Sequence, residues 1–304
     1  MNKANSLVNN FVEERLQGNL SALSSFDFAQ LRGDKKYGVC RSNSFDCDNT
    51  NLANAIYLLA FEDIWKDLTY LSLENRMYRG DTINSFNTTF GRTVTPGGFA
   101  GLNRFNPDKS LQKRVQRFHS LYHTIGNFIV LPNASVGGRT LNTFRGFHYQ
   151  WRDYIDKFIE ALHLLLTAPQ GTHDKLFHQL IEANVKDFEP YFHQEGFELL
   201  MKKLLLNDYI GQEGEPNRLF NVVYHWDTRL TRDGYLQHVN QYLDFSESFI
   251  EKRGAKMVEI LASKLQTKHS AFHTSINLLI SNHYHYGKSS GESYHRLHRY
   301  SHQL

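Results

Sequence analysis

Two histidines in a predicted helix have the spacing of a metal-binding pair. His119 and His123 lie four positions apart, so both side chains project from one face of a helix, as paired zinc ligands do. Metalloproteases place a glutamate directly after the first histidine, whereas Ser120 occupies that position here. Because no third ligand is suitably spaced, we assign no metal. Histidines at the edge of a core would show the same spacing.

Two fragments near residue 287 match only part of a catalytic motif. Gly287-Lys288-Ser289 resembles the end of a phosphate-binding loop, but Asn282 stands where that motif needs a glycine. Residues 287–291 also match the G-x-S-x-G nucleophile elbow, which requires a strand-to-helix turn within an α/β sheet. The sequence lacks an alternating strand–helix pattern. We therefore predict no catalytic residue, no enzymatic activity and no cofactor.

The segment 283–304 is rich in tyrosine, histidine and arginine. Tyrosine and arginine are enriched at binding hot spots, because they bring large contact areas and fork-shaped donors. The same mixture can stack on single-stranded nucleic acid. A loosely ordered segment is the third interpretation of this composition.

The elements that must position these residues are mainly helices. Apolar residues recur at helical spacing in eight stretches, namely 7–16, 52–68, 111–122, 151–166, 176–188, 197–209, 246–265 and 272–280. We expect an interruption of the long late helix at Gly254. Short strands are possible at 128–131 and 221–225, and segments 72–107 and 132–148 resemble loops. This pattern predicts a mainly α, multi-helix fold with long irregular loops and at most a few short strands.

The composition is that of a folded chain with a sizeable core. The 304 residues are 40% hydrophobic, and a net charge of +3 is too small to nominate nucleic acid as the ligand. Two cysteines, no apolar N-terminal region and no membrane-length apolar run predict a reduced, cytoplasmic protein. We divide the chain into a helical and loop-rich region (1–107), a helical core (108–282) and a tail (283–304). A single domain fits equally well.

An ordered set of residues between 118 and 156 resembles a family of uncharacterised bacterial and phage proteins. The set comprises Tyr122-His123-Thr124-Ile125-Gly126-Asn127, then Leu131-Pro132-Asn133, Leu141-Asn142, Arg145-Gly146 and Asp153-Tyr154-Ile155-Asp156. The upstream Tyr78-Arg79-Gly80-Asp81-Thr82 is also similar to that family. The similarity covers roughly residues 75–210, and it is most specific in the middle.

This family core has two physical interpretations. Gly126 could let the chain turn after a helix, and Asn127 could close that turn. Arg145 could reach a carboxylate such as Asp153 or Asp156, or hold a ligand. Both a buried structural network and a ligand site therefore remain open. The residues concerned are Arg79, His123, Thr124, Gly126, Asn127, Arg145 and Asp153.

A looser similarity links the same segment to nucleases. Some nuclease domains of the histidine–metal type carry a T-x-G-N-x-x-L stretch after the catalytic histidine, and His123 would supply part of such a site. The upstream Asp-His pair and a suitable proline are missing, so the general base and metal ligands stay unassigned. A metal-dependent nuclease of the defence or toxin type, using His119 or His123, is the alternative function.

In size, helical content and family core, the chain resembles phage inhibitors of the Gabija defence system. This resemblance implies a viral, non-enzymatic anti-defence protein that forms oligomers around a nuclease–helicase complex in the bacterial cytoplasm. It implies neither a membrane contact nor direct nucleic-acid binding. The candidate partner-binding residues are then the pair after Pro190 and the tail, namely Tyr191, Phe192, Tyr284, Tyr286, Tyr294, Arg296, Arg299 and Tyr300.

Overall fold

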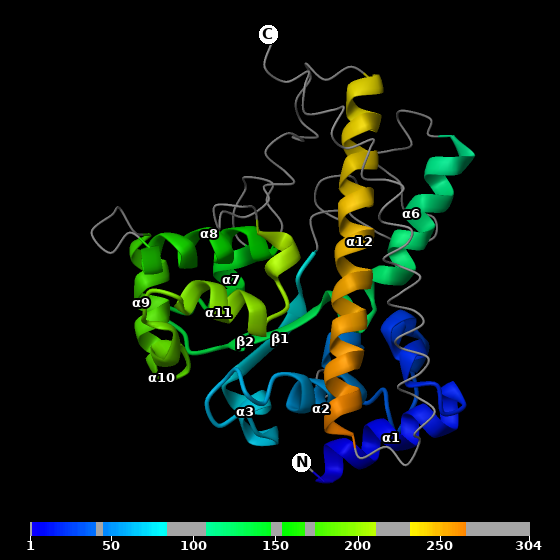
Figure 1. Ribbon diagram of the computed structural model, residues 1–304, viewed down its shortest axis with the longest axis horizontal. Helices are drawn as coiled ribbons and strands as arrows, with labels where there is room; N and C mark the ends of the chain where they lie inside the picture. Colours follow the sequence, from blue (N-terminus) through cyan, green and yellow to red (C-terminus); the bar gives the residue numbers. More distant parts are fainter. Residues whose placement is uncertain are drawn as a thin grey trace. The chain divides into compact units, whose positions relative to one another are not determined.

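The computed structural model of the chain describes residues 2–40, 45–83, 108–146, 154–167, 174–210 and 232–265. Helices and one two-stranded sheet make up this part, which confirms the predicted mainly α fold class (Figure 1). The elements up to Lys264 belong to one compact unit, Met1–Lys264. Among the described residues, no helix is both long enough and apolar enough to cross a membrane.

The N-terminal elements are α-helices and short 3₁₀ helices. In chain order they are α1 (Asn2–Leu16), η1 (Leu20–Ser25), η2 (Phe28–Leu31), η3 (Cys47–Asn49), α2 (Asn51–Ala60) and α3 (Tyr70–Asn75). The predicted helix 52–68 was too long, because the chain leaves the helical conformation at Phe61. The following turns bury Trp65, whose indole N–H donates to the Val130 carbonyl at 2.9 Å.

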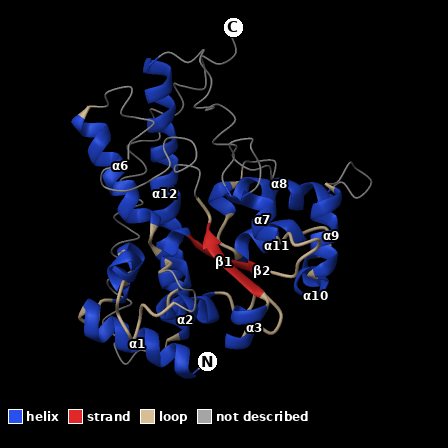
Figure 2. Ribbon diagram, turned by 180° about the vertical axis from the view of Figure 1, so that it is seen from behind, coloured by secondary structure: helices blue, strands red, loops and turns tan. Residues whose placement is uncertain are grey.

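The sheet, shown in Figure 2, pairs β1 (Met77–Asp81) with β2 (Phe128–Pro132) in antiparallel fashion. In this register Asp81 lies opposite Phe128. The strand predicted at 128–131 is confirmed. The interpretation of 72–107 as a loop was wrong in its first part, which holds most of α3 and all of β1. Arg79, Gly80 and Asp81 all lie in this strand. β1 forms because β2, buried along its whole length, needs a hydrogen-bonding partner.

Two helices distant in sequence lie side by side, as both ribbon views show: α6 (Lys109–Tyr122) and α12 (Arg232–Lys264). Apolar packing joins them at Phe118 and Tyr242, whose ring centroids are 5.8 Å apart. The ion pair Arg114–Asp244 at 2.7 Å adds a polar seam. α12 runs without a break through Gly254, contrary to the predicted interruption, because one glycine costs a helix only about 1 kcal/mol.

A second group of helices lies across the sheet from α12 (Figure 1). After η4 (Ile125–Asn127) and β2, its members are α7 (Leu141–Gly146), α8 (Tyr154–Thr167), α9 (Lys175–Ala183), α10 (Val185–Phe188), η5 (Glu189–Tyr191), α11 (Gly196–Lys203) and η6 (Asn207–Tyr209). The predicted stripe of α8 is buried at Ile155, Phe158, Ile159 and Leu162. The strand predicted at 221–225, the helix predicted at 272–280 and the proposed boundary at 107 lie outside or at the edge of the described residues.

Candidate functional site

The residues of the predicted family core that lie in β1 and η4 come together where β1 and β2 meet the end of α6. Antiparallel pairing places Asp81 opposite Phe128, directly after η4. The Thr82 backbone N–H donates to the Asn127 carbonyl at 2.7 Å. Segments about 45 residues apart in the sequence therefore build one polar site.

Asn127 is the centre of this site and is fully buried. Its Oδ1 accepts from the Thr82 hydroxyl and from the Ile83 backbone N–H, both at 2.8 Å. Its Nδ2 donates to the carbonyls of Tyr122 at 3.0 Å and Ile83 at 3.1 Å. The bond to Tyr122 closes the turn after α6. Because both donors and both acceptor positions are occupied, the Asn127 amide serves the fold.

Gly126 allows two backbones to approach closely. A Cβ at this position would lie 2.0 Å from the Ile250 carbonyl oxygen of α12. The φ of Gly126 is not positive, so the close approach to α12, and not a left-handed turn, requires glycine at this position. Gly254 faces the same crossing, where a Cβ added to it would lie 3.6 Å from the Gly126 Cα.

Arg253 locks this crossing and was missed by sequence reasoning. Its Nη1 donates to the carbonyls of Gly126 at 2.8 Å and Phe128 at 2.6 Å, and its Nε donates to the Leu204 carbonyl at 3.2 Å. Burial lowers the pKa of Arg253 to about 9. The buried Nη2 has no hydrogen-bond partner among the described residues. A buried arginine on a helix gives no signal in the sequence, because arginine is usually exposed.

Arg79 ties the sheet to the N-terminal helices. Its Nε donates to Asn54 Oδ1 of α2 at 3.1 Å, and its Nη1 donates to the carbonyls of Leu73 and of Met77. On the same strand, Asp81 accepts from the Tyr122 hydroxyl at 2.8 Å. These bonds use the family-core side chains to join α2, α3, β1 and α6.

The predicted histidine pair lies at the end of α6. The rings of His119 and His123 are 5.5 Å apart in an edge-to-face arrangement. The buried His123 Nδ1 has no hydrogen bond among the described residues and lies 3.9 Å from Asp27 Oδ1. Burial lowers the pKa of both histidines, so their imidazoles are neutral at pH 7. No three His, Cys, Asp or Glu side chains of the described part are placed to hold a metal together.

A buried acidic cluster beside β1 was also missed. Asp48, at 6% exposure, has an Oδ1 without a hydrogen-bond partner in the described part of the chain. Burial raises its pKa well above the ordinary value, and the charges of Asp81 and Asp46 add to that effect. Burial, followed by the charge of Asp27, also raises the pKa of the intervening Cys47 thiol. The sequence does not predict this cluster, because aspartate is usually exposed and its burial is set by tertiary packing.

The pair after Pro190 divides between core and surface. Tyr191 is 1% exposed, and its hydroxyl donates to the Ile64 carbonyl at 2.7 Å. Phe192 is 47% exposed. Of the two predicted contact residues, Phe192 is therefore the one that presents an apolar ring to solvent.

Several predicted site residues lie outside what the structure describes. The backbone of Arg145 belongs to α7, but its side chain and Asp153 are outside the described part, so their predicted ion pair stays a prediction. The predicted contact residues of the tail are outside it too, namely Tyr284, Tyr286, Tyr294, Arg296, Arg299 and Tyr300.

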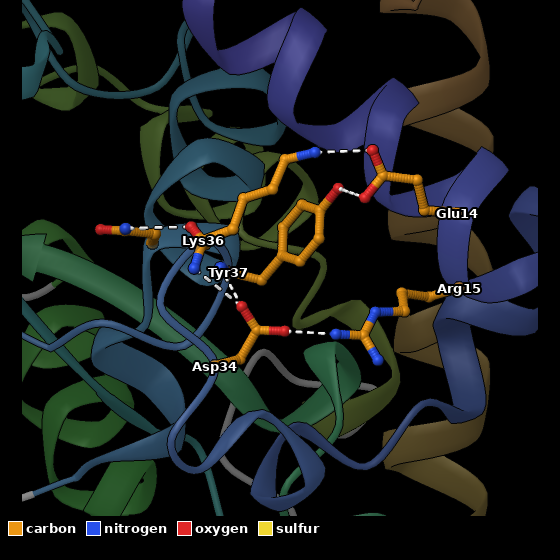
Figure 3. Close-up of polar contacts among 6 residues, drawn as sticks. Glu14, Arg15, Asp34, Lys36 and Tyr37 are labelled. Atoms are coloured by element: carbon orange, nitrogen blue, oxygen red, sulfur yellow. Dashed lines mark hydrogen bonds and ion pairs between the residues drawn. The ribbon is translucent and has the colours of Figure 1, made fainter.

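A separate polar network joins α1 to the turn after η2 (Figure 3). Glu14 accepts from Lys36 at 2.6 Å and from the Tyr37 hydroxyl at 2.8 Å, and Arg15 pairs with Asp34 at 2.6 Å. The Tyr37 backbone N–H, ahead of the one on Lys36 and the Arg15 charge, lowers the pKa of Asp34. Glu14 and Lys36 are exposed, so this network fastens a turn and does not form an enclosed site.

The comparisons with known proteins add one finding. A family model described as a family of unknown function (DUF6994) matches residues 104–257, which include η4, β2 and Arg253. No curated protein and no solved structure matches the chain significantly. Because the family model covers just over half of the 304 residues, the chain belongs to the family DUF6994.

Proposed function

We propose that this chain is a phage-type anti-defence protein that binds a bacterial immune complex and inhibits it without catalysing a reaction. The supporting observation is that the described residues of the family core make contacts that stabilise the fold. The Asn127 amide makes all the hydrogen bonds that it can, and the Thr124 hydroxyl donates to the Leu121 carbonyl. The absence of a side chain at Gly126 lets the backbone of α12 pass close to it. A core of this kind builds a scaffold, and a scaffold acts through its surface.

Phe192 is a described residue that suits a partner contact, because its aromatic ring is half-exposed. It follows η5, which is held to the core by the bond from Tyr191 to Ile64 and by the packing of Tyr191 against Trp65. Because the backbone that carries this ring is already fixed, binding costs less conformational entropy. Burial of its remaining apolar area would contribute about 25 cal/mol per Å². This site would work together with the predicted tail residues.

The partner comes from the resemblance to phage inhibitors of the Gabija system. We propose that the chain assembles as an oligomer around the nuclease–helicase complex and blocks its access to DNA. An inhibitor of this type needs a folded surface and affinity, and it needs no reactive group.

Co-elution tests this proposal. The purified chain is mixed with a Gabija complex at micromolar concentration and analysed by size exclusion with light scattering. We expect a defined co-assembly, which Phe192→Ala weakens and which Tyr191→Phe leaves intact apart from a small loss of stability. Unchanged elution of both components would reject this partner.

The alternative is a metal-dependent nuclease, and one observation favours it. The half-buried, neutral His123 has an Nδ1 without a hydrogen bond in the described part of the chain, beside Asp27 and His119. A neutral imidazole is the form that ligates a metal or accepts a proton. DNA cleavage that needs a divalent metal and disappears in a folded His123→Ala variant would decide for this function. Circular dichroism of the variant is the control for folding.

A further inference from the structure

Two aspartates, Asp46 and Asp48, flank Cys47 at the start of η3. The side chains of Asp46 and Asp48 are within hydrogen-bonding distance of each other. Two carboxyl groups can share a hydrogen bond only when one of them carries a proton. Asp46 is exposed and Asp48 is 6% exposed, so a charge on Asp48 is the more costly of the two. The geometry therefore places the shared proton on Asp48.

The surroundings of the pair strengthen this assignment. Asp48 Oδ1 is buried without a hydrogen-bond partner among the described residues, so a negative charge there would lack compensation from a donor. Arg79, the nearby cation, donates to Asn54 and to two carbonyls. Titratable groups on the neighbouring elements interact electrostatically with Asp46, Cys47 or Asp48. They lie at η2, α2, β1 and the end of α6, namely Asp27, Tyr57, Arg79, Asp81 and His123.

We propose that Asp46 and Asp48 form a proton-binding site that holds η3 against β1 and α2. With one proton present, the Asp48 hydroxyl donates to the Asp46 carboxylate. When that proton leaves to water, two carboxylates face each other beside Asp81, and like charges at this separation repel. The docking of η3, which the Tyr57 hydroxyl also supports through its 2.9 Å bond to the Asp48 carbonyl, then weakens.

The sign of the pH dependence follows from where the proton is held. Folded Asp48 keeps its proton above the ordinary aspartate pKa, whereas in a locally opened η3 it loses the proton at that ordinary value. Opening therefore releases a proton between the two values and becomes easier as the pH rises. Below the ordinary aspartate pKa, the proton stabilises the docking of η3 fully. Above the pKa of folded Asp48, the docking no longer depends on pH.

Hydrogen exchange with mass spectrometry on the full chain tests this site. We expect the protection factors of the η3 backbone amides to fall by up to tenfold per pH unit, from about pH 4 to the Asp48 midpoint. Asp48→Asn places a neutral amide where the protonated acid was, so it should remove this dependence. Asp187→Asn is the matched control, because Asp187 is a buried carboxyl on α10 with a raised pKa; it should leave the η3 profile unchanged.

Direct titration keeps the test independent of variant folding. Carbon NMR of the wild-type carboxyl groups should show Asp48 titrating well above the ordinary aspartate range, and Asp46→Asn should move that midpoint down. An Asp48 midpoint near 4, or a pH profile of η3 protection that Asp48→Asn leaves unchanged, would overturn the proposal.

Discussion

Replacing Gly126 with alanine is the sharpest test of the fold that carries the family core. The new Cβ would lie 2.0 Å from the Ile250 carbonyl oxygen and 2.9 Å from the Gly254 backbone nitrogen, whereas ordinary contacts begin at 3.4 Å. Both obstacles are backbone atoms of α12, so no side-chain rotation relieves the clash. Overpacking alone costs about 1–3 kcal/mol. Separating η4 from α12 also weakens the two bonds from Arg253 Nη1, each worth about 1.5–3 kcal/mol.

We therefore expect Gly126→Ala to lower the free energy of unfolding by about 4 kcal/mol, and the melting temperature by roughly 10 °C. Gly254→Ala is the matched control in the same crossing. Its Cβ would meet the Ser24 carbonyl oxygen at 3.2 Å, and the gain of about 1 kcal/mol in helix propensity offsets that tightness. Urea unfolding followed by circular dichroism compares the two. A loss below about 1 kcal/mol for Gly126→Ala would show that η4 and α12 can separate at little cost, against the contact described.

Three further predictions concern groups inside and outside the core. Arg253→Met removes the donor to three carbonyls and should lower the free energy of unfolding, measured in urea, by about 3 kcal/mol. An unchanged urea midpoint would contradict the role of Arg253 at the crossing. Burial lowers the pKa of His123, so its stabilising effect is complete above about pH 6.5 and is lost as the pH falls through the lower folded value. Denaturant midpoints between pH 7.5 and 5 should therefore fall more steeply in the wild type than in His123→Gln, and parallel curves would argue against a half-buried neutral ring. Tyr191→Phe should cost about 1 kcal/mol through the lost bond to Ile64, whereas Phe192→Ala should change stability by less than about 0.5 kcal/mol. The reverse order of these two costs in thermal unfolding would contradict their placement.

The helices were predictable because burial in them follows a 3.6-residue period. In α6 the apolar residues Leu111, Val115, Phe118 and Tyr122 are all buried, as their spacing predicts. Strand β2 was predictable as a short apolar run. Strand β1 was not, because Met77–Asp81 mixes polar residues and glycine, and only its partner 47 or more residues downstream makes it a strand.

The sequence named some residues of the polar site but not their contacts. The resemblance pointed to Asn127 and Gly126, but the role of Gly126 depends on the α12 backbone, more than 120 residues away. Asp48 and Arg253 gave no signal, because the burial of a charged side chain is set by tertiary packing. Tyr191 and Phe192 are adjacent aromatics, and only the path of η5 determines which of them is buried.

DNA cleavage by a purified Gabija complex titrated with this chain tests the proposed inhibition most directly. We expect cleavage to fall in proportion to the chain added, and the chain alone to leave DNA intact with or without divalent metals. Phe192→Ala should shift the titration to higher concentration. A fully active complex at micromolar chain, or metal-dependent cleavage by the chain alone, would contradict the proposed inhibition.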